Sequence, residues 1–198
     1  MSRAWFESLQ GQHTANSRLV YCMVLGTIPV GLVGISLSDA VTESLRSPLV
    51  IAAATLIFGV LLGYADKYAL LQRAEITLKD ALIVGLMQAI ALIPGTSRSG
   101  ITMTAGLLMG LEKEVAARFS FLLSIPVIAL AGLLKGLELF QSKLQPEWDL
   151  MIIGVAVSAL VAYLTIGWFL SVLEKLGMLP FVVYRLILSI FLVAVFLG

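Results

Sequence analysis

The chain has 198 residues, of which 60% are hydrophobic and 13% are charged, and its formal net charge is +1 at pH 7. Such a composition, with a mean hydropathy of +1.02, predicts a polytopic membrane protein and excludes a soluble domain. The near-neutral charge excludes nucleic acid as a partner. Cys22 is the only cysteine, so it cannot form a disulfide within the chain, and we expect it to be a small buried hydrophobic residue.

Five apolar runs have the length of membrane-spanning helices, because about 20 residues cross a hydrocarbon core of about 30 Å. They cover residues 19–37, 48–65, 116–134, 150–172 and 180–197. The first run is longer than the apolar part of a signal peptide and has no convincing cleavage site after it, so we expect it to be retained. Residues 1–198 are therefore predicted to form one integral membrane domain.

A sixth apolar region, residues 81–111, is interrupted at residues 94–100 by the sequence PGTSRSG, here named the PGTSRSG loop. One continuous helix would be about 46 Å long, and Pro94 followed by Gly95 would break it. We therefore expect two short helices that meet at the loop near the middle of the membrane, so that the segment enters and leaves on the same side. The predicted fold class is an all-α polytopic membrane protein with about five spanning helices and this re-entrant pair.

Positive charges in the short loops predict the orientation. With a cytoplasmic N-terminus, the cytoplasmic face carries Arg3, Arg18, Lys67, Arg73, Lys79, Lys113, Arg118, Lys175 and Arg185. The other face carries Arg46, Lys135 and Lys143. A third spanning helix at residues 81–111 would move Lys113 and Arg118 to the other face and reduce this asymmetry, so the charges support the re-entrant pair. The C-terminus is then predicted to lie outside the cytoplasm.

Arg98 is the only charged residue among residues 81–111, and it lies in the PGTSRSG loop. An arginine at membrane depth costs about 2.5 kcal/mol or more unless it meets water, a partner or an anion. The apolar segments contain no Asp or Glu, so the sequence offers no partner for an internal ion pair. We therefore favour anion binding over a structural role in which Arg98 would bind the carbonyls of the broken helix.

The neighbours of Arg98 are hydrogen-bond donors. Ser97 or Ser99 can cap a helix that begins near Ile101, where free N–H groups and the helix dipole favour negative charge. The forked guanidinium of Arg98 matches a phosphate group through two parallel hydrogen bonds. The candidate phosphate-binding residues are Gly95, Thr96, Ser97, Arg98, Ser99 and Gly100.

Three pairs of glycines have the GxxxG spacing that lets membrane helices approach closely. The pairs are Gly59 with Gly63, Gly106 with Gly110, and Gly132 with Gly136. We interpret all three as helix-packing positions rather than as ligand sites.

The segment QAIALIPGTSRSG at residues 88–100 resembles the second signature of the bacterial undecaprenyl-diphosphate phosphatase family of the bacitracin-resistance type. The sequences GLLMG at 106–110 and FSFLLSIP at 119–126 continue the resemblance, and PFVVYR at 180–185 is similar to the family's C-terminal segment. The resemblance extends from about Arg18 onward.

This resemblance implies an activity, a location and a set of catalytic residues. The expected reaction is hydrolysis of undecaprenyl diphosphate to undecaprenyl phosphate, which recycles the lipid carrier of peptidoglycan synthesis on the outer side of the bacterial plasma membrane. The expected fold is an inverted-repeat, transporter-like arrangement. By the same resemblance, Arg98, Ser97 and Ser99 are the candidate catalytic residues.

The family's first signature, two glutamates four residues apart followed by an SSTxH stretch, does not occur in this sequence. The single histidine, His13, lies in a polar N-terminal stretch where we expect a solvated loop. We therefore expect the larger C-terminal part of the family fold, partnered by an N-terminal half or by a second copy of the chain. The alternative is a non-enzymatic binder of polyprenyl phosphates or a carrier of anionic lipids.

Carboxylates are scarce near the PGTSRSG loop. Glu112 and Glu114 are nearest in sequence, but an intervening helix of about 16 Å puts them at the cytoplasmic boundary. No group of residues has the spacing of a metal site, so we predict no cofactor held by the chain itself and leave a divalent cation, Mg²⁺ or Ca²⁺, open.

The inventory of chemical groups predicts the activity of the 198-residue chain. We expect it to bind a long-chain isoprenoid diphosphate but to release phosphate no faster than an Arg98→Ala variant, because it offers donors without a positioned carboxylate pair or histidine. Supplying the N-terminal half of a full-length relative should restore turnover in a phosphate-release assay. Robust Arg98-dependent hydrolysis by the chain alone would instead identify Ser97, Ser99 or Thr102 as a nucleophile.

Overall fold

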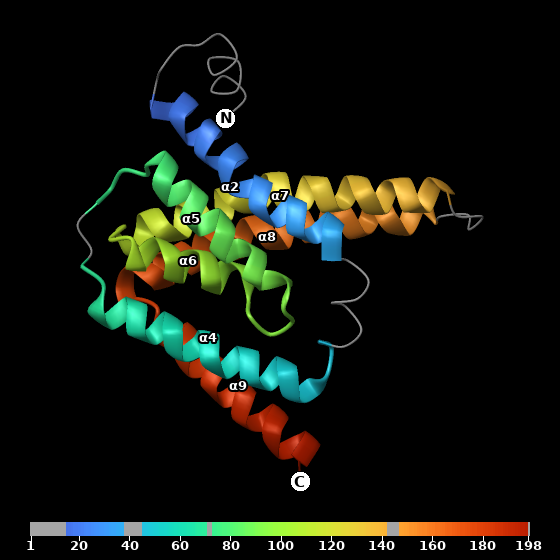
Figure 1. The fold of residues 1–198 in the computed structure, drawn as a ribbon. Helices are drawn as coiled ribbons and strands as arrows, with labels where there is room; N and C mark the ends of the chain where they lie inside the picture. The colour runs from blue at the N-terminus through green and yellow to red at the C-terminus, as the bar shows by residue number, and fades with distance from the viewer. Residues whose placement is uncertain (1–14, 38–44, 71–72, 142–146, 198) are drawn as a thin grey trace.

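The computed structural model describes residues 15–37, 45–70, 73–141 and 147–197. These residues form seven α-helices, one short 3-10 helix and a single isolated β-bridge (Figure 1). Five of the helices are long and apolar enough to cross a membrane: α2 (Ala15–Leu37), α4 (Pro48–Tyr68), α7 (Lys113–Gln141), α8 (Trp148–Leu176) and α9 (Leu179–Leu197). The predicted all-α, multi-pass membrane protein is confirmed.

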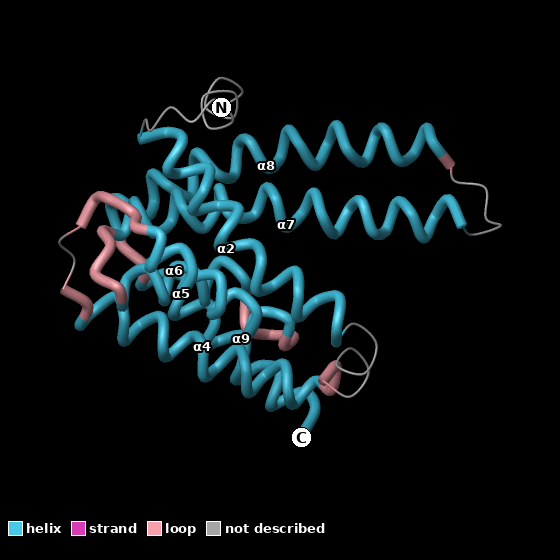
Figure 2. The backbone as a smooth tube through the Cα atoms, turned by 45° about the horizontal axis from the view of Figure 1, so that its top comes forward, coloured by secondary structure: helices cyan, strands magenta, loops and turns pink. Residues whose placement is uncertain are grey.

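The remaining elements are the predicted re-entrant pair. Helix α5 (Leu78–Ala89) continues into the 3-10 helix η1 (Ile90–Leu92), and α6 (Arg98–Leu108) runs back after the PGTSRSG loop (Figure 2). Its two ends meet, because the Arg73 amide donates to the Gly110 carbonyl at 3.1 Å and the Glu112 amide donates to the Arg73 carbonyl at 3.0 Å. The segment therefore enters and leaves on one side, as the sequence predicted.

An ion pair holds this meeting point together. The Arg73 guanidinium donates to both carboxylate oxygens of Asp80 at 2.9 Å and also to the Met109 carbonyl, which ends α6. Asp80 in turn accepts hydrogen bonds from the amide and hydroxyl of Thr77, the residue that caps α5. Burial alone would raise the pKa of Asp80, but the hydrogen bonds from Arg73 and Thr77 outweigh it and hold that pKa below its usual value.

Close helix contacts surround the re-entrant pair. Helix α2 packs on α5, and α4 packs on both α6 and α9 (Figure 1). The α2–α5 contact depends on glycine, since a Cβ at Gly85 would lie 2.4 Å from the Gly26 carbonyl oxygen. Cys22 is fully buried in the cluster between these helices, as predicted. The pair is thus enclosed by spanning helices on opposite sides.

The GxxxG predictions have mixed outcomes. Cβ atoms at Gly59 and Gly63 would meet α9 at 3.1 and 3.2 Å, and one at Gly106 would lie 3.0 Å from the Ala116 Cβ, which confirms close packing at these positions. Gly110 instead ends the re-entrant segment with a φ of 84°. For Gly132 and Gly136 the packing prediction finds no support among the described residues, because a Cβ there would meet nothing within 4 Å of them.

Some predicted features lie outside the described residues. These are His13 with its solvated loop, and the charges of Arg3 and Lys143. The spanning helices themselves extend up to seven residues beyond the predicted apolar runs, as where α7 continues to Gln141 rather than ending at residue 134. Charged and polar residues at the ends of an apolar run still form the backbone hydrogen bonds of a helix. Hydropathy alone therefore underestimates the length of the helix.

Asp80→Asn should lower the Tm of the detergent-solubilised chain by roughly 4 °C at neutral pH, because the amide loses its charged bonds to Arg73. Since the folded-state pKa lies below the ordinary value of 3.8, the carboxylate stabilises the fold above that pH. This contribution is lost as the pH falls through the folded-state pKa, so the two Tm curves should converge at acid pH, below the ordinary pKa of the carboxyl group.

Glu138→Gln, at an exposed ion pair on α7, serves as the control and should leave the Tm unchanged. Curves for Asp80→Asn and the parent that stay parallel down to acid pH would contradict the proposed anchor.

Candidate functional site

The PGTSRSG loop is pressed against the first two turns of α4. Gly95 has a φ of 91°, and a Cβ there would lie 2.4 Å from the Ile51 carbonyl oxygen, so only glycine fits. The Thr55 hydroxyl also donates to the Gly95 carbonyl at 3.2 Å. Ile51 and Thr55 are the fourth and eighth residues of α4, so the loop packs against the first half of that helix. The location of the loop near the middle of the membrane stays a prediction.

Ser97 caps the second arm of the re-entrant pair. Its hydroxyl accepts a hydrogen bond from the Gly100 amide at 3.2 Å, and its φ is 66°, a value that side-chain-bearing residues rarely adopt. Helix α6 consequently begins at Arg98, three residues earlier than the expected start near Ile101. The positive end of the α6 dipole is therefore at the loop itself.

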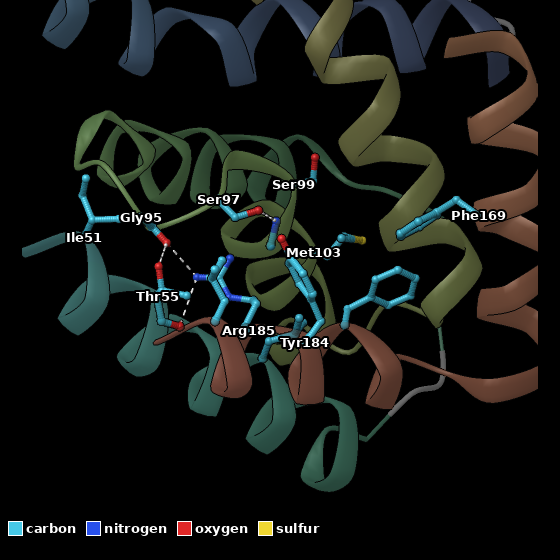
Figure 3. A pocket seen from close by; sticks show the side chains of 13 residues that line it. Ile51, Thr55, Gly95, Ser97, Ser99, Met103, Phe169, Tyr184 and Arg185 are labelled. Atoms are coloured by element: carbon cyan, nitrogen blue, oxygen red, sulfur yellow. Dashed lines mark hydrogen bonds between the residues drawn. The ribbon is translucent and has the colours of Figure 1, made fainter. Parts of the chain in front are cut away.

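Arg185 is the residue that the sequence analysis misplaced. It was counted among the cytoplasmic charges, but in the structure it is only 8% exposed and lies inside α9. Its Nη2 atom donates to the Gly95 carbonyl at 2.9 Å and to the Thr55 carbonyl at 3.3 Å (Figure 3). It also donates to the Thr96 carbonyl at 2.9 Å. The cytoplasmic assignment of Arg185 is wrong, because these buried carbonyls compensate its charge within the membrane domain. The remaining count of eight charges against three still favours the same orientation.

A cavity of about 470 Å³ opens beside the loop and α9 (Figure 3). Its polar wall is formed by Thr55, Gly95, Ser97, Ser99, Gly100 and Arg185. Its apolar wall is formed by Ile51, Leu62, Met103, Phe169, Phe181, Tyr184 and Leu188. The structure therefore brings four of the six predicted phosphate-binding residues together around one space.

Arg98 and Thr96 do not line this cavity. Arg98 is half-buried, and its Nη1 atom is buried without a hydrogen-bond partner among the described residues. Thr96 is fully buried, and its hydroxyl also finds no partner there, although its carbonyl binds Arg185. Two arginines thus flank the PGTSRSG loop, with Arg185 on the cavity side.

Unpartnered polar atoms gather at the loop. Besides Arg98 Nη1 and Thr96 Oγ1, the Nε atom of Arg185 is buried and lacks a partner within the described part of the chain. Buried polar groups are nearly always hydrogen-bonded in folded proteins, so such a group of exceptions calls for an explanation. Two of the three atoms, Nη1 of Arg98 and Nε of Arg185, are donors on positively charged groups, and a bound anion would accept hydrogen bonds from them.

Acidic groups lie elsewhere in the described structure. Glu112 follows the far end of α6, and Glu114 pairs with Arg118 on the first turns of α7, so both are separated from Ser99 by the length of α6, as predicted. No group of three His, Cys, Asp or Glu side chains that could hold a metal ion occurs among the residues described. The polar wall of the cavity carries N–H donors, hydroxyls and backbone carbonyls, a set that suits an anion better than Mg²⁺ or Ca²⁺.

Sequence reasoning missed Arg185 and Thr55, although one signal was present. Arg185 lies six residues after Leu179, within the last apolar run. A charge inside an apolar segment needs a partner, as was argued for Arg98. Thr55 carries no such signal, because a single threonine in an apolar helix usually bonds to its own backbone.

Comparison with known proteins identifies the family of the chain. Residues 1–191 match the family described as bacitracin resistance protein BacA. The chain belongs to the BacA family. The match begins at residue 1, so the likeness covers more than the stretch from Arg18 that the sequence motifs indicated.

Individual BacA relatives are about half identical to this chain. The undecaprenyl-diphosphatase of Nitrosococcus oceani is 53% identical over 99% of this chain and 75% of its own length. Undecaprenyl-diphosphatase 2 of Stutzerimonas stutzeri is 51% identical over the whole chain and 76% of its own length. The undecaprenyl-diphosphatase of Saccharophagus degradans is 50% identical over 93% of this chain and 70% of its own length.

Arg185→Ala should lower the affinity for an isoprenoid diphosphate at least about tenfold, because three carbonyls lose a charged donor and the loop is released from α4. Arg185→Lys should restore little, since one ammonium group lacks the planar fork of the guanidinium. Binding in detergent, together with hydrogen exchange of residues 94–100, measures both effects.

Ser189→Ala is a matched control, because Ser189 lies one turn further along α9 and donates to the Ala52 carbonyl of α4 at 3.0 Å without touching the loop. Equal losses of affinity in Ser189→Ala and Arg185→Ala would show that only α4–α9 packing matters, and would refute a positioning role for Arg185.

Proposed function

We propose that the chain acts as an undecaprenyl-diphosphatase. Water attacks the terminal phosphorus of undecaprenyl diphosphate, the bond to the bridging oxygen breaks, and the products are undecaprenyl phosphate and inorganic phosphate. The observation that carries this proposal is the group of buried, unpartnered donors of Arg98 and Arg185 at the PGTSRSG loop of a BacA-family chain. Relatives at about 50% identity bear the name undecaprenyl-diphosphatase, which supports the assignment.

The loop supplies charge neutralisation, which is the main demand of phosphoryl transfer. The transferred phosphoryl group would lie at the start of α6, where the helix dipole and the free N–H groups of the first turn favour an anion. Arg98 would bind two of its oxygens through the forked guanidinium. Ser97 and Ser99, which face the cavity, would donate to the same group or to the leaving phosphate.

A divalent cation enters this proposal only with the substrate. The described walls of the cavity contribute no carboxylate, whereas the diphosphate itself offers several anionic oxygens. Mg²⁺ or Ca²⁺ would therefore be held by the lipid diphosphate, and no step performed by the loop residues depends on it.

The proposed location is the bacterial plasma membrane, with the N-terminus in the cytoplasm and the C-terminus outside. The distribution of lysine and arginine supports this orientation. In this orientation the PGTSRSG loop, which packs against the first half of α4, lies in the outer half of the membrane. A diphosphate bound there would be processed on the outer side, where the lipid carrier of peptidoglycan synthesis has delivered its cargo.

Arg98→Ala should abolish binding of an isoprenoid diphosphate, and Arg98→Lys should weaken it severely, because lysine offers a point charge without two parallel donors. Ser97→Ala and Ser99→Ala should each be milder, since the backbone N–H groups of α6 remain. Equilibrium binding to the five proteins, parent included, measures the series.

Arg118→Ala removes an exposed arginine near the start of α7 and should bind as the parent does. Unchanged affinity in Arg98→Ala would refute the anion site. Tight, Arg98-dependent binding by a preparation that, even with an N-terminal half supplied, releases no phosphate would favour the non-enzymatic binder or carrier.

A further inference from the structure

The start of α6 is held by hydrogen bonds from two other helices. From α9, Arg185 donates to the carbonyls of Gly95 and Thr96 in the PGTSRSG loop. From α7, a hydrogen bond of 2.6 Å joins the hydroxyl of Ser120 to that of Thr102 in α6. The candidate catalytic residues of the loop therefore lie between two anchors, one on each side along the chain.

Thr102 lies on the same face of α6 as Arg98. The two residues are four apart in one helix, so their side chains are separated by about one turn of 5.4 Å. Ser99 and Met103, which line the cavity, are each one position further along, and this turns their face by about 100°. Because Thr102 points to α7, Arg98 leaves α6 on that face as well, which agrees with its absence from the cavity wall.

The single hydroxyl proton of Thr102 is directed to the backbone of α6. It is shared between the Arg98 carbonyl at 2.9 Å and the Ser99 carbonyl at 3.1 Å, and carbonyl oxygens can only accept. The Ser120 hydroxyl must then donate to Thr102 Oγ1. A relay of hydrogen bonds consequently runs from Ser120 through Thr102 to the first turn of α6.

The Ser120 hydroxyl has no other hydrogen-bond partner among the described residues. Ser120 is 4% exposed, Thr102 is 2% exposed, and neither lines the cavity. A serine inside a helix commonly bonds to its own backbone, as Ser124 does one turn later by donating to the Phe121 carbonyl at 2.6 Å. Ser120 instead connects two helices.

We infer that Ser120 is a positioning residue of the anion site: through the Thr102 hydroxyl it fixes the first turn of α6 and with it the guanidinium of Arg98. This inference rests on the proposed function, since the anion site must bind the diphosphate. A displacement of about 1 Å in such a site can cost about a hundredfold in rate. Nη1 of Arg98 has no partner within the described part of the chain, so the backbone that Ser120 holds sets its position before the ligand binds.

The test measures the affinity of the full 198-residue chain for inorganic diphosphate in lipid nanodiscs, together with hydrogen exchange of residues 98–103. Ser120→Ala should weaken binding about fivefold and speed the exchange, because Thr102 loses its donor. Thr102→Val should weaken binding at least as much. The double variant should bind as Thr102→Val does, because no hydroxyl remains through which Ser120 could act. Thr102→Ser keeps the hydroxyl and should bind within about twofold of the parent.

Ser124→Ala is the matched control, because the Ser124 hydroxyl bonds within α7. It should change neither the affinity nor the exchange of residues 98–103. Equal losses of affinity in Ser124→Ala and Ser120→Ala would show that only the integrity of α7 matters, and would overturn the positioning role.

A lower Tm of Ser120→Ala without a loss of affinity would also overturn it, because the relay would then only stabilise the fold. Losses that add in the double variant would show that Ser120 does not act through Thr102. A parent chain that binds no diphosphate would refute the proposed function, and hydrogen exchange would still decide the relay, since unchanged exchange in Ser120→Ala contradicts it and faster exchange supports it.

Discussion

The rest of the site depends on the hydrogen bonds that the guanidinium of Arg185 donates to the PGTSRSG loop and to α4. A broken helix inside a membrane exposes carbonyl groups that water cannot reach, and each unsatisfied group costs several kcal/mol. Arg185 satisfies those of Gly95 and Thr96 and bonds to Thr55 of α4 at the same time. One side chain from α9 therefore makes the interruption between α5 and α6 tolerable and attaches it to a spanning helix.

Fixing the loop in this way concentrates positive potential at one place. Ser97, Ser99 and Arg185 line one cavity at the start of α6, and the guanidinium of Arg98 belongs to the same loop without lining that cavity. Among the described residues no carboxylate pairs with Arg98 or Arg185, and one buried donor of each, Nη1 of Arg98 and Nε of Arg185, has no partner. A preorganised set of donors of this kind binds an anion strongly because it needs no rearrangement when the anion arrives.

Polar interactions at the opposite end of the re-entrant pair have a different role. The Arg73–Asp80 pair joins the start of α5 to the end of α6, and Lys113 of α7 pairs with Asp66 of α4 at 2.6 Å. These charges lie at helix ends and tie neighbouring elements together. Residues 148–168 of α8 are by contrast all exposed and mostly apolar, which suits a surface against lipid.

The sequence by itself determined the elements, because hydropathy and helix-breaking residues act locally. It located five spanning helices, the interruption at Pro94 and Gly95, and the importance of an arginine inside an apolar segment. It could not identify the partner of the loop, because Arg185 and Gly95 are 90 residues apart and a count of loop charges treats every arginine near a helix end alike.

Only the tertiary structure decided which local signals matter. The glycine pairs at 59/63 and 132/136 look the same in sequence, yet the first packs against α9 and the second meets nothing among the described residues. Phe169 and Phe181 read as ordinary membrane residues until helix packing places them beside the loop. Contacts between helices depend on how the faces of distant segments meet, and that information is absent from any local pattern of residues.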